Sequence, residues 1–403
     1  MKTLFISYNG ALEPLLQSQG LAYLEGLSDK GLKFILLTFE KRNNFGNKEA
    51  ISKIGEELKK SQIEWHRLCY HKKPAIISTL YDILVGIIYS AFLILKRRIT
   101  VIHARSFVPA AMAYILSKAF RIKFVFDMRG MMIDEYVDAQ IIKKDGLIYK
   151  LGKILEKKFL ISSASTIVLT EKIKNVIKGF DYLKNRPDFS IEVIPCCVNI
   201  RRFRYDPQTK GLSRGRNLKN KFVFVYLGSV GTWYFLEGML DFFVSAKSKI
   251  PDAHFLFLSR GNQEYIKAAI LNKDLNLGDF TISEASHQEI PGYISDCDAG
   301  IAFYKQTFSR LGCSPVKFAE YLACGIPVVV NSGIGDTEEI VSLNRIGAVA
   351  KEFSENCYQQ AIERLLELKS EGLPLGRRCR AVAEREFSLE GGIEKYRNIY
   401  KGL

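Results

Sequence analysis

The segment SPVKFAEYLACGIPVVVNSGIGDTEEI, residues 314–340, predicts a short helix followed directly by a buried strand. Ser314 is suited to cap the helix and Pro315 to occupy its first position, because a hydroxyl satisfies a free N–H and proline needs none. We expect the helix to end near Gly325, before the apolar run Val328–Val330. A helix followed by a buried strand is the repeating unit of a parallel sheet wrapped by helices.

Apolar runs of strand length alternate with helical stretches throughout the chain. Residues 1–200 contain TLFISY, KFILLTF, VIHA, KFVFDM, STIVLT and IEVIP, and residues 201–385 contain KFVFVYLG, HFLFLSR, AGIAFY, IPVVVN and GAVA. This alternation predicts an α/β protein with two Rossmann-like, doubly wound domains, joined through a polar and basic stretch at roughly 194–220. If the carboxyl edges of the two sheets face each other, they form a site for two substrates.

The composition is that of a soluble globular protein, with 47% hydrophobic and 25% charged residues among 403. The eight cysteines include no C-x-x-C pair, and the start MKTLFISYNG lacks the features of a secretory signal. We therefore expect a cytoplasmic protein. Residues 1–200 account for +12 of the net charge of +15, with 31 Lys and Arg against 19 Asp and Glu. This excess suggests an anionic partner, for which a phospholipid surface is favoured over a lipid diphosphate or nucleic acid.

The most apolar stretch, Ile83–Leu95, has 13 residues and is shorter than the roughly 20 that cross a bilayer. We expect a buried or surface-lying helix there. The cluster Lys96-Arg97-Arg98 follows it, which suits a peripheral contact with the inner face of a membrane. A core helix with a solvated basic end is an equally good interpretation.

The helix that begins near Ser314 is a candidate anion site. Free N–H groups at a helix start attract negative charge, and Lys317 adds a cation where an acidic residue would be usual. Glu320 follows on the same helix, and a carboxylate at a sheet edge can accept two hydrogen bonds from a ribose diol. A solvated glutamate on a helix surface is the alternative.

The same segment resembles the donor-site signature of the family 4 retaining glycosyltransferases. That signature has two Glu residues separated by seven others, and then a small residue, Cys or Ala, Gly and x-Pro-Val. EYLACGIPVVV matches its second half, so the resemblance implies that Glu320 binds the ribose of a nucleotide-sugar, with UDP as the expected nucleotide. Gly312 stands where the first Glu is usual, and the following SP-x-K is similar to a sub-branch of surface-polysaccharide synthesis.

The resemblance extends over most of the chain. VIPCCVNIRRF resembles the interdomain motif of the family, and REFSLEGGIEKYRNIY resembles its closing helix. It implies the glycosyltransferase-B architecture of two facing Rossmann-like domains. Residues 1–200 would bind the acceptor and residues 201–385 the donor, while 386–403 would form a helix that returns to the first domain.

The loop after the first strand of the second domain departs from the family. Relatives have Gly-Arg and a later Lys that hold the donor diphosphate, whereas this chain has Gly228-Ser229 and Glu237-Gly238. Ser229 and the N–H groups around Gly228 can cradle phosphate, with Arg260 or Lys317 supplying charge.

In the first domain, four residues are candidates because they follow predicted strands. Gly10 lets the backbone approach a diphosphate. Arg105 is expected to contact the acceptor, and Asp127 and Arg129 to act in catalysis near the transferred sugar. The alternatives are an ordinary turn glycine and a structural ion pair of Asp127 with either arginine.

The expected reaction is hexosyl transfer from a nucleotide diphosphate sugar to a saccharide or lipid-linked acceptor. Fixed N–H dipoles and cations stabilise the leaving diphosphate, so we expect neither a metal nor a cofactor. Retention of configuration is implied by the resemblance alone. Two other functions stay open: a nucleotide-sugar epimerase, and a non-catalytic protein that binds a membrane or a partner. Phosphate-loop kinases and dinucleotide dehydrogenases are disfavoured because their glycine motifs are absent, and nucleic-acid binding lacks a supporting module.

Overall fold

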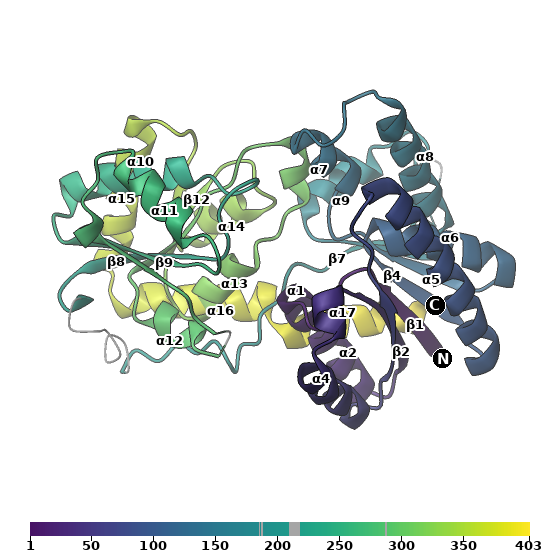
Figure 1. Ribbon diagram of the computed structural model, residues 1–403. Helices are drawn as coiled ribbons and strands as arrows, with labels where there is room; N and C mark the ends of the chain where they lie inside the picture. The colour runs from purple at the N-terminus through teal and green to yellow at the C-terminus, as the bar shows by residue number, and fades with distance from the viewer. Residues whose placement is uncertain (185, 187, 209–217, 287) are drawn as a thin grey trace. The chain divides into compact units, whose positions relative to one another are not determined.

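The structure is a computed structural model that describes residues 1–184, 186, 188–208, 218–286 and 288–403. It divides into two compact units, which are shown in Figure 1. Unit 1 comprises Met1–Pro195 and Leu389–Leu403, and unit 2 comprises Cys196–Ser388. Residues 196–200, which we had placed in the first domain, belong to unit 2, because Val198 pairs with Ser388 there. Residues 209–217 of the expected junction lie outside the described residues.

Unit 1 is built on a seven-stranded parallel sheet in the order β3-β2-β1-β4-β5-β6-β7. Thr3 lies opposite both Phe34 and Val101, so the chain reverses its direction of travel across the sheet between the first and fourth strands. The strands are β1 (Lys2–Ser7), β2 (Lys33–Glu40), β3 (Glu64–Cys69), β4 (Val101–Arg105), β5 (Lys123–Asp127), β6 (Ser165–Val168) and β7 (Ile191–Val193).

Helices cover both faces of this sheet (Figure 1). Crossovers between parallel strands are right-handed, so the reversal at β4 moves the later helices to the opposite face. The chain places α5, α6 and α8 in one layer, and α17 packs on α2 in another. The helices of unit 1 are α1 (Pro14–Leu16), α2 (Ala22–Asp29), α3 (Arg42–Phe45), α4 (Lys48–Lys60), α5 (Ala75–Arg97), α6 (Phe107–Phe120), α7 (Met132–Asp138), α8 (Leu147–Ser162), α9 (Glu171–Lys178) and α17 (Leu389–Gly402), and a π-helical turn spans Gln17–Leu21.

The apolar helix is longer than the sequence indicated. It begins at Ala75, eight residues before the expected start at Ile83. The sequence did not reveal these first residues because polar residues on the inner side of the helix interrupt the apolar run. By length and composition its residues Ile76–Arg97 could cross a membrane, although 28% of the apolar window is buried against unit 1.

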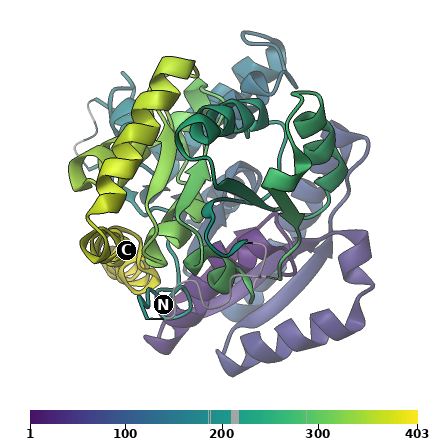
Figure 2. The ribbon, with the colours of Figure 1, turned by 90° about the vertical axis from the view of Figure 1, so that its left-hand side faces the viewer.

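Unit 2 contains a six-stranded parallel sheet in the order β10-β9-β8-β11-β12-β13. Its strands are β8 (Phe222–Leu227), β9 (Ala253–Leu258), β10 (Phe280–Ser283), β11 (Ala299–Ala302), β12 (Val328–Asn331) and β13 (Gly347–Ala350). Its helices, visible on both sides of the sheet in Figure 2, are α10 (Leu236–Lys249), α11 (Gln263–Leu271), α12 (Ile290–Ser295), α13 (Val316–Ala323), α14 (Thr337–Asn344), α15 (Glu355–Ser370) and α16 (Leu373–Phe387), with 3-10 turns at Leu277–Asp279 and Phe308–Gly312.

Two apolar cores lie on the two faces of this second sheet. One contains residues of α10, α11 and α15, and the other contains residues of α12, α13, α14 and α16. The two doubly wound α/β domains predicted from the sequence are therefore confirmed.

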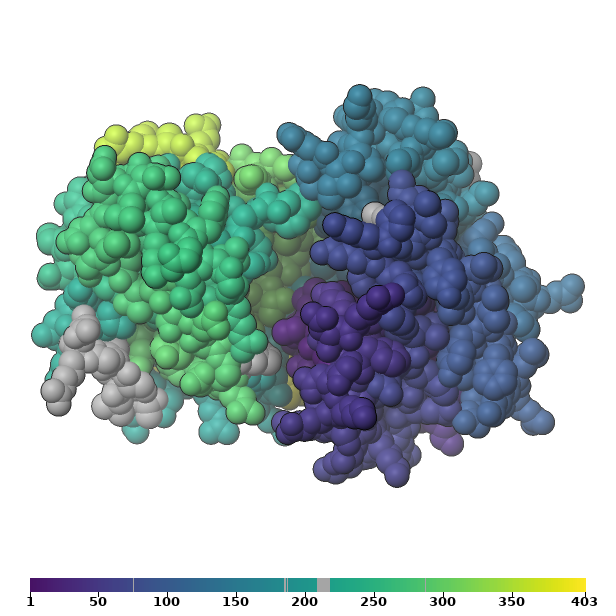
Figure 3. All heavy atoms as spheres, in the orientation of Figure 1, coloured from purple at the N-terminus to yellow at the C-terminus, as the bar shows by residue number. Residues whose placement is uncertain are grey.

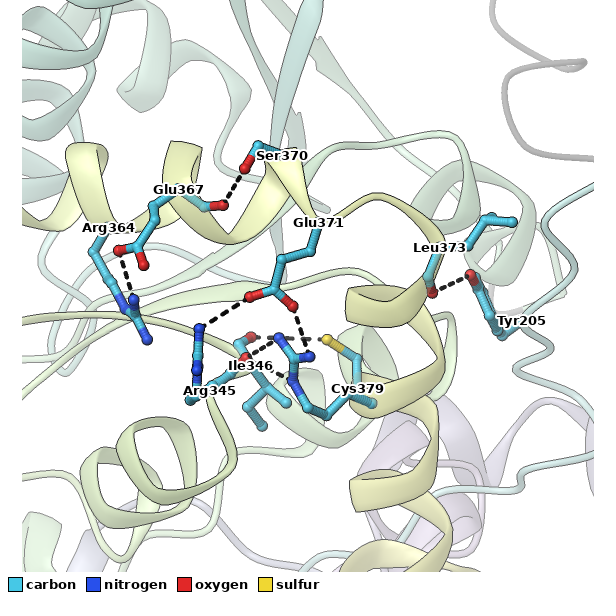
Figure 4. Close-up of polar contacts among 10 residues, drawn as sticks. Tyr205, Arg345, Ile346, Arg364, Glu367, Ser370, Glu371, Leu373 and Cys379 are labelled. Carbon is cyan, nitrogen blue, oxygen red and sulfur yellow. Dashed lines mark hydrogen bonds and ion pairs between the residues drawn. The ribbon is translucent and has the colours of Figure 1, made fainter.

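An ionic cluster holds the end of α15 and the start of α16 against α14 (Figure 4). The Glu371 carboxylate accepts a hydrogen bond from Arg345 at 3.2 Å and pairs with Arg378 at 2.8 Å. Arg378 also donates to the Arg345 carbonyl at 2.8 Å, and the hydrogen bond from Arg378 lowers the pKa of Glu371. The cluster positions α16, which packs directly on α13, the helix that carries the predicted donor residues.

Candidate donor-binding site

Helix α13 starts one residue later than the sequence indicated. Pro315 takes the capping position, and Ser314 does not cap the helix because its Oγ accepts a hydrogen bond from the Cys196 N–H at 3.1 Å. The helix ends at Ala323, and Gly325 follows with φ of +72°, where a side chain would meet the Tyr205 ring at 2.1 Å. Ser314 thus holds the connecting segment to unit 2, and its place in donor binding stays a prediction.

The Tyr321 side chain fixes α13 against the sheet. Its hydroxyl accepts a hydrogen bond from the Leu227 N–H at 2.9 Å, at the end of β8. Its ring lies against Gly300 of β11, where an added Cβ would be only 2.3 Å from the ring. Because both contacts are short, the side chains on the first turns of α13 have defined positions near the carboxyl ends of β8 and β11.

The Lys317 ammonium lies in a cage of three tyrosine rings. Its Nζ is 3.9 Å from the centre of the Tyr226 ring, 4.1 Å from that of Tyr234 and 5.6 Å from that of Tyr304. The side chain is 6% exposed, and Nζ has no hydrogen-bond partner among the described residues. Burial lowers the pKa of Lys317 to about 7, against the smaller opposing influence of Glu320. An ammonium that contacts only ring faces can still donate hydrogen bonds to a ligand.

The glycine loop after β8 lies directly on this ammonium. Gly228 has φ of +117°, and a Cβ at that position would be 3.3 Å from Lys317 Nζ. The sequence placed both residues in the donor site, and the structure brings them together. Ser229 is exposed, and its carbonyl accepts a hydrogen bond from the Tyr226 hydroxyl at 2.5 Å. Tyr226 thereby connects the cage to the loop.

Glu320 lies one helical turn after Lys317 and is 6% exposed. Burial raises the pKa of Glu320 to about 7, while the charges of Lys317 and Arg202 oppose the shift. No role was predicted for Arg202 from the sequence, although Arg202 lies in the segment that resembles the interdomain motif of the family. The structure shows that Arg202 is close enough to influence the Glu320 carboxylate.

Of two arginines near the donor-site candidates, Arg310 is buried close to the tyrosine cage, whereas Arg260 is exposed. Arg260 follows β9 and is exposed, with Nη2 donating to the Ala285 carbonyl at 3.4 Å. Arg310 is 6% exposed, lies 4.4 Å above the Trp233 ring, and its charge influences the pKa of Tyr234 in the cage. Arg310 was not predicted from the sequence. It could have been recognised as a cation four residues before Ser314, in the segment that leads into the donor-site signature.

In unit 1, the backbone around Gly10 is occupied by a carboxylate. Glu40 is fully buried, and its Oε1 accepts a hydrogen bond from the Ala11 N–H at 2.7 Å. A Cβ on Gly10 would be 2.2 Å from Glu40 Oε2. The close approach of Glu40 explains why glycine is required here, and diphosphate binding at Gly10 stays a prediction.

Arg105, Asp127 and Arg129 do meet, as an ion-pair cluster at the carboxyl ends of β4 and β5. Asp127 is 1% exposed and lies 3.2 Å from Arg105 Nη1 and 3.6 Å from Arg129 Nη1. Burial would raise the pKa of Asp127, but the Arg129 charge, the His103 hydrogen bond and Arg105 outweigh it and hold the pKa well below its usual range. The carboxylate is therefore ionised and serves the two guanidinium groups.

Helix α17 closes this cluster from the last residues of the chain. The Tyr396 hydroxyl donates to Asp127 Oδ2 at 3.2 Å, and the Tyr400 hydroxyl is 2.6 Å from His103 Nδ1. Burial lowers the pKa of His103, so its imidazole is neutral. The adjoining cavity has a volume of about 10 Å³, which accommodates one water. The surroundings of Asp127 are those expected for a structural ion pair, which was the alternative interpretation of the sequence. Its catalytic role stays a prediction.

Metal ligands are not grouped in the part of the chain that the structure describes. No cluster of three or more His, Cys, Asp or Glu side chains there could hold an ion. Asp298, in the one Asp-x-Asp sequence, accepts a hydrogen bond from the Val223 N–H at 3.0 Å and pairs with Lys369 at 3.0 Å. Transfer without a metal stays a prediction.

Comparison with known families gives one match, over residues 211–385, to the family described as "Glycosyl transferases group 1". The match contains the tyrosine cage, Arg310 and all of α13. Residues 211–385 are thus similar to a glycosyltransferase group 1 domain. A comparison with curated protein sequences gave no match. The group 1 match agrees with the broad resemblance noted in the sequence, while family 4 and its surface-polysaccharide sub-branch stay predictions.

Solved structures resemble the whole chain, including the residues that match the family. A glycosyltransferase from Rickettsia africae has a TM-score of 0.70 at 18% identity, covering 100% of this chain and 98% of its own. Anabaena HepE in complex with UDP and glucose has a TM-score of 0.72 at 13% identity, covering 100% of each chain. Sucrose-phosphate synthase from Thermosynechococcus elongatus has a TM-score of 0.70 at 15% identity, covering 100% of this chain and 98% of its own. These likenesses confirm the fold class, two parallel-sheet α/β domains of the glycosyltransferase-B type.

Proposed function

We propose that this protein transfers a hexosyl group from a UDP-sugar to a saccharide or lipid-linked acceptor, with retention of configuration and without a metal ion. The observation that carries the proposal is the caged Lys317 ammonium, which lies beside Gly228 within the group 1 domain. The choice of UDP is supported by the likeness to HepE, whose structure contains UDP and glucose.

The cage accounts for a cation that the glycine loop lacks. Family 4 glycosyltransferases, by the resemblance noted in the sequence, hold the donor diphosphate with an arginine of this loop and a later lysine, where this chain has Ser229 and Glu237. Lys317 supplies positive charge at the same loop from a different element, and the N–H groups around Gly228 supply dipoles. Arg310 adds a second buried cation near the cage. A diphosphate bound there would have its developing negative charge stabilised by groups that are already in place.

Glu320 is the proposed ribose ligand. A diphosphate at the loop would place the nucleoside next to the same helix, and an ionised carboxylate can accept hydrogen bonds from both ribose hydroxyls. Because the pKa of Glu320 is near 7, binding of the diol would favour ionisation of the carboxylate and lower that pKa.

Unit 1 is proposed to bind the acceptor. The Arg129 side chain is 10% exposed while Asp127 is buried, so Arg129 is the member of the cluster that can reach a ligand, and Asp127 orients it. Arg105 is held inside the same cluster and is proposed to support acceptor binding through it. With no nucleophile proposed on the protein, retention requires the acceptor hydroxyl to form its bond to the anomeric carbon on the face from which the diphosphate leaves. We propose that the leaving phosphate accepts the hydroxyl proton.

The test is a calorimetric titration with UDP, followed by a transfer assay with UDP-sugars, each with and without EDTA. Bound UDP at about 100 times its dissociation constant should stabilise the protein by about 2.7 kcal/mol, which a thermal-shift assay detects. Glu320→Ala should abolish transfer and weaken UDP binding by about 10- to 100-fold, since it removes a charged hydrogen-bond acceptor. The matched control is Glu352→Ala, an exposed carboxylate after β13 that lies outside the glycine loop. Normal turnover in Glu320→Ala would refute the donor-site assignment.

A further inference from the structure

Helix α5 carries a continuous apolar stripe on its exposed side. Eight large apolar side chains there are each at least 50% exposed: Ile76, Ile77, Leu80, Tyr81, Leu84, Ile88, Phe92 and Leu95. They recur every three or four residues and therefore lie along one side of the helix. At about 1.5 Å per residue, the stripe from Ile76 to Leu95 extends over about 30 Å of this helix of 23 residues.

The other side of α5 is fixed to the core of unit 1, so the stripe cannot turn inward. Asp82 is 1% exposed and accepts hydrogen bonds from the Tyr8 hydroxyl at 2.8 Å and the His71 N–H at 3.0 Å. A Cβ on Gly86 would be 2.7 Å from Met112 Sδ of α6. A helix held by these contacts lies on the unit along its length, which distinguishes it from a helix that leaves the protein to cross a bilayer.

The neighbouring helices extend this apolar surface. α5 packs on α6 and α6 on α8, and Figure 3 shows these segments, in blue to blue-teal, at the surface of unit 1. α6 adds Ile115, and α8 adds Leu147, Ile148, Leu151, Ile154 and Leu155. With the stripe, these make 14 of the 27 exposed large apolar side chains among the described residues. Single exposed apolar residues are ordinary, but this concentration on three adjacent helices marks an interaction surface. We call these 14 residues the apolar face.

Lysine and arginine side chains surround the apolar face. The exposed cations are Lys72 and Lys73 before α5, Lys96 and Arg98 at its end, Lys143 and Lys144 before α8, and Lys150, Lys157 and Lys158 on α8. Lys96 Nζ lies 5.1 Å from the centre of the Phe92 ring, so its stem follows the stripe. Acidic residues are nearly absent: within residues 72–98 the one carboxylate is the buried Asp82, and within 143–158 the exposed one is Asp145.

We propose that the apolar face docks on an anionic phospholipid bilayer, with α5 lying in the plane of the interface. The apolar side chains would enter the boundary between headgroups and acyl chains, while the surrounding lysines contact phosphate. Lysine is depleted at protein–protein interfaces, so this composition favours a lipid partner over a second polypeptide. The inference stands on this surface and shares no residue with the donor site, but it names the partner that a lipid-linked acceptor would require.

The experiment is flotation of the full chain with vesicles of phosphatidylcholine alone or mixed with phosphatidylglycerol. We expect binding to the mixed vesicles that weakens with added salt. Leu84→Ser with Ile88→Ser should lower the partition coefficient at least about 30-fold, because two apolar side chains no longer enter the interface. Lys157→Gln with Lys158→Gln should lower it by about 30-fold, at about fivefold per charge.

Matched controls separate these effects from general changes of surface. Leu271→Ser with Leu343→Ser removes two exposed apolar residues of unit 2, and Lys59→Gln with Lys60→Gln removes two exposed lysines of α4. Both controls should bind as the unmodified protein does. The proposal is overturned if the protein does not float with anionic vesicles, if the controls lose as much binding as the face variants, or if light scattering shows a dimer that Leu84→Ser with Ile88→Ser dissociates. UDP binding, measured in parallel, reports on the donor site independently.

Discussion

The buried Lys317 ammonium lowers the stability of the folded protein but is proposed to bind the donor diphosphate. Its replacement should therefore raise the free energy of unfolding and weaken UDP binding. In Lys317→Met, an apolar side chain of similar length replaces the ammonium inside the ring cage. The lowering of the Lys317 pKa from its ordinary 10.5 to about 7 corresponds to about 4 kcal/mol of lost stability at pH 7. Attraction to the three rings offsets part of this, at about 0.5–2 kcal/mol each. We expect Lys317→Met to raise the free energy of unfolding by about 2 kcal/mol.

The sign of the pH dependence follows from the lowered pKa. The unfolded chain binds a proton at Lys317 that the folded chain has lost between pH 7 and 10.5, so the folded protein gains stability as the pH rises through this range. The advantage of Lys317→Met should therefore be present below pH 7 and fade toward pH 10.5. Urea denaturation at several pH values measures it, with the exposed Lys351→Met as the control.

Loss of the ammonium should at the same time weaken UDP binding, because a charge-assisted contact to the diphosphate is worth about 1.5–3 kcal/mol, or roughly 10- to 100-fold in affinity. Higher stability with weaker binding is a combination that a simple packing role does not produce. A Lys317→Met protein that is no more stable than the unmodified chain and binds UDP equally well would refute the reasoning.

The remaining predictions concern the pH dependence of UDP binding and two buried contacts of unit 1. UDP affinity should fall by up to about tenfold per pH unit above pH 7, because the bound diphosphate requires protonated Lys317. Calorimetry at pH 8 to 9, where Glu320 is already ionised, should show uptake of a proton in buffers of different ionisation enthalpy, and a flat affinity from pH 7 to 9 would contradict it. Gly10→Ala should destabilise unit 1 by about 1–3 kcal/mol in urea denaturation, because its Cβ would overlap the Glu40 carboxylate, and an unchanged midpoint would show that the loop adapts. Tyr400→Phe should cost about 1–3 kcal/mol by leaving His103 Nδ1 buried without its hydroxyl partner, and equal stability would mean that water replaces the hydroxyl.

The two strands that the sequence did not reveal are β3 and β10, and each is the outermost strand of its sheet. Central parallel strands are buried on both faces and appear as continuous apolar runs, such as Phe34–Phe39. β3, with the sequence EWHRLC, and β10, with FTIS, are largely half-buried and mix polar with apolar residues. Their pattern therefore resembles that of loops, although the neighbouring strand imposes the extended backbone.

The sequence predicted that Lys317 and Glu320 belong to the candidate donor site, but it did not predict which side chains surround them. The spacing of Lys317 and Glu320 along the chain places both on one helix, and the signature around them is local. The tyrosine cage is not local: Tyr226 lies near the end of β8, Tyr234 in the loop that follows, and Tyr304 in the loop after β11. Arg310 was missed for the same reason, because its proximity to the cage depends on how the loop before α13 folds back over Trp233.

Periodic apolar runs and glycine-terminated helices specified by themselves two parallel α/β domains, since burial against a sheet or a helix layer is required wherever such a pattern occurs. The tertiary structure alone decided the state of the charged residues. It enclosed Asp127 beneath tyrosines from the last helix, left Lys317 among aromatic rings, and turned one side of α5 into a continuous exposed stripe. Charge state and exposure depend on what surrounds a side chain in space, and those neighbours come from segments distant in the sequence.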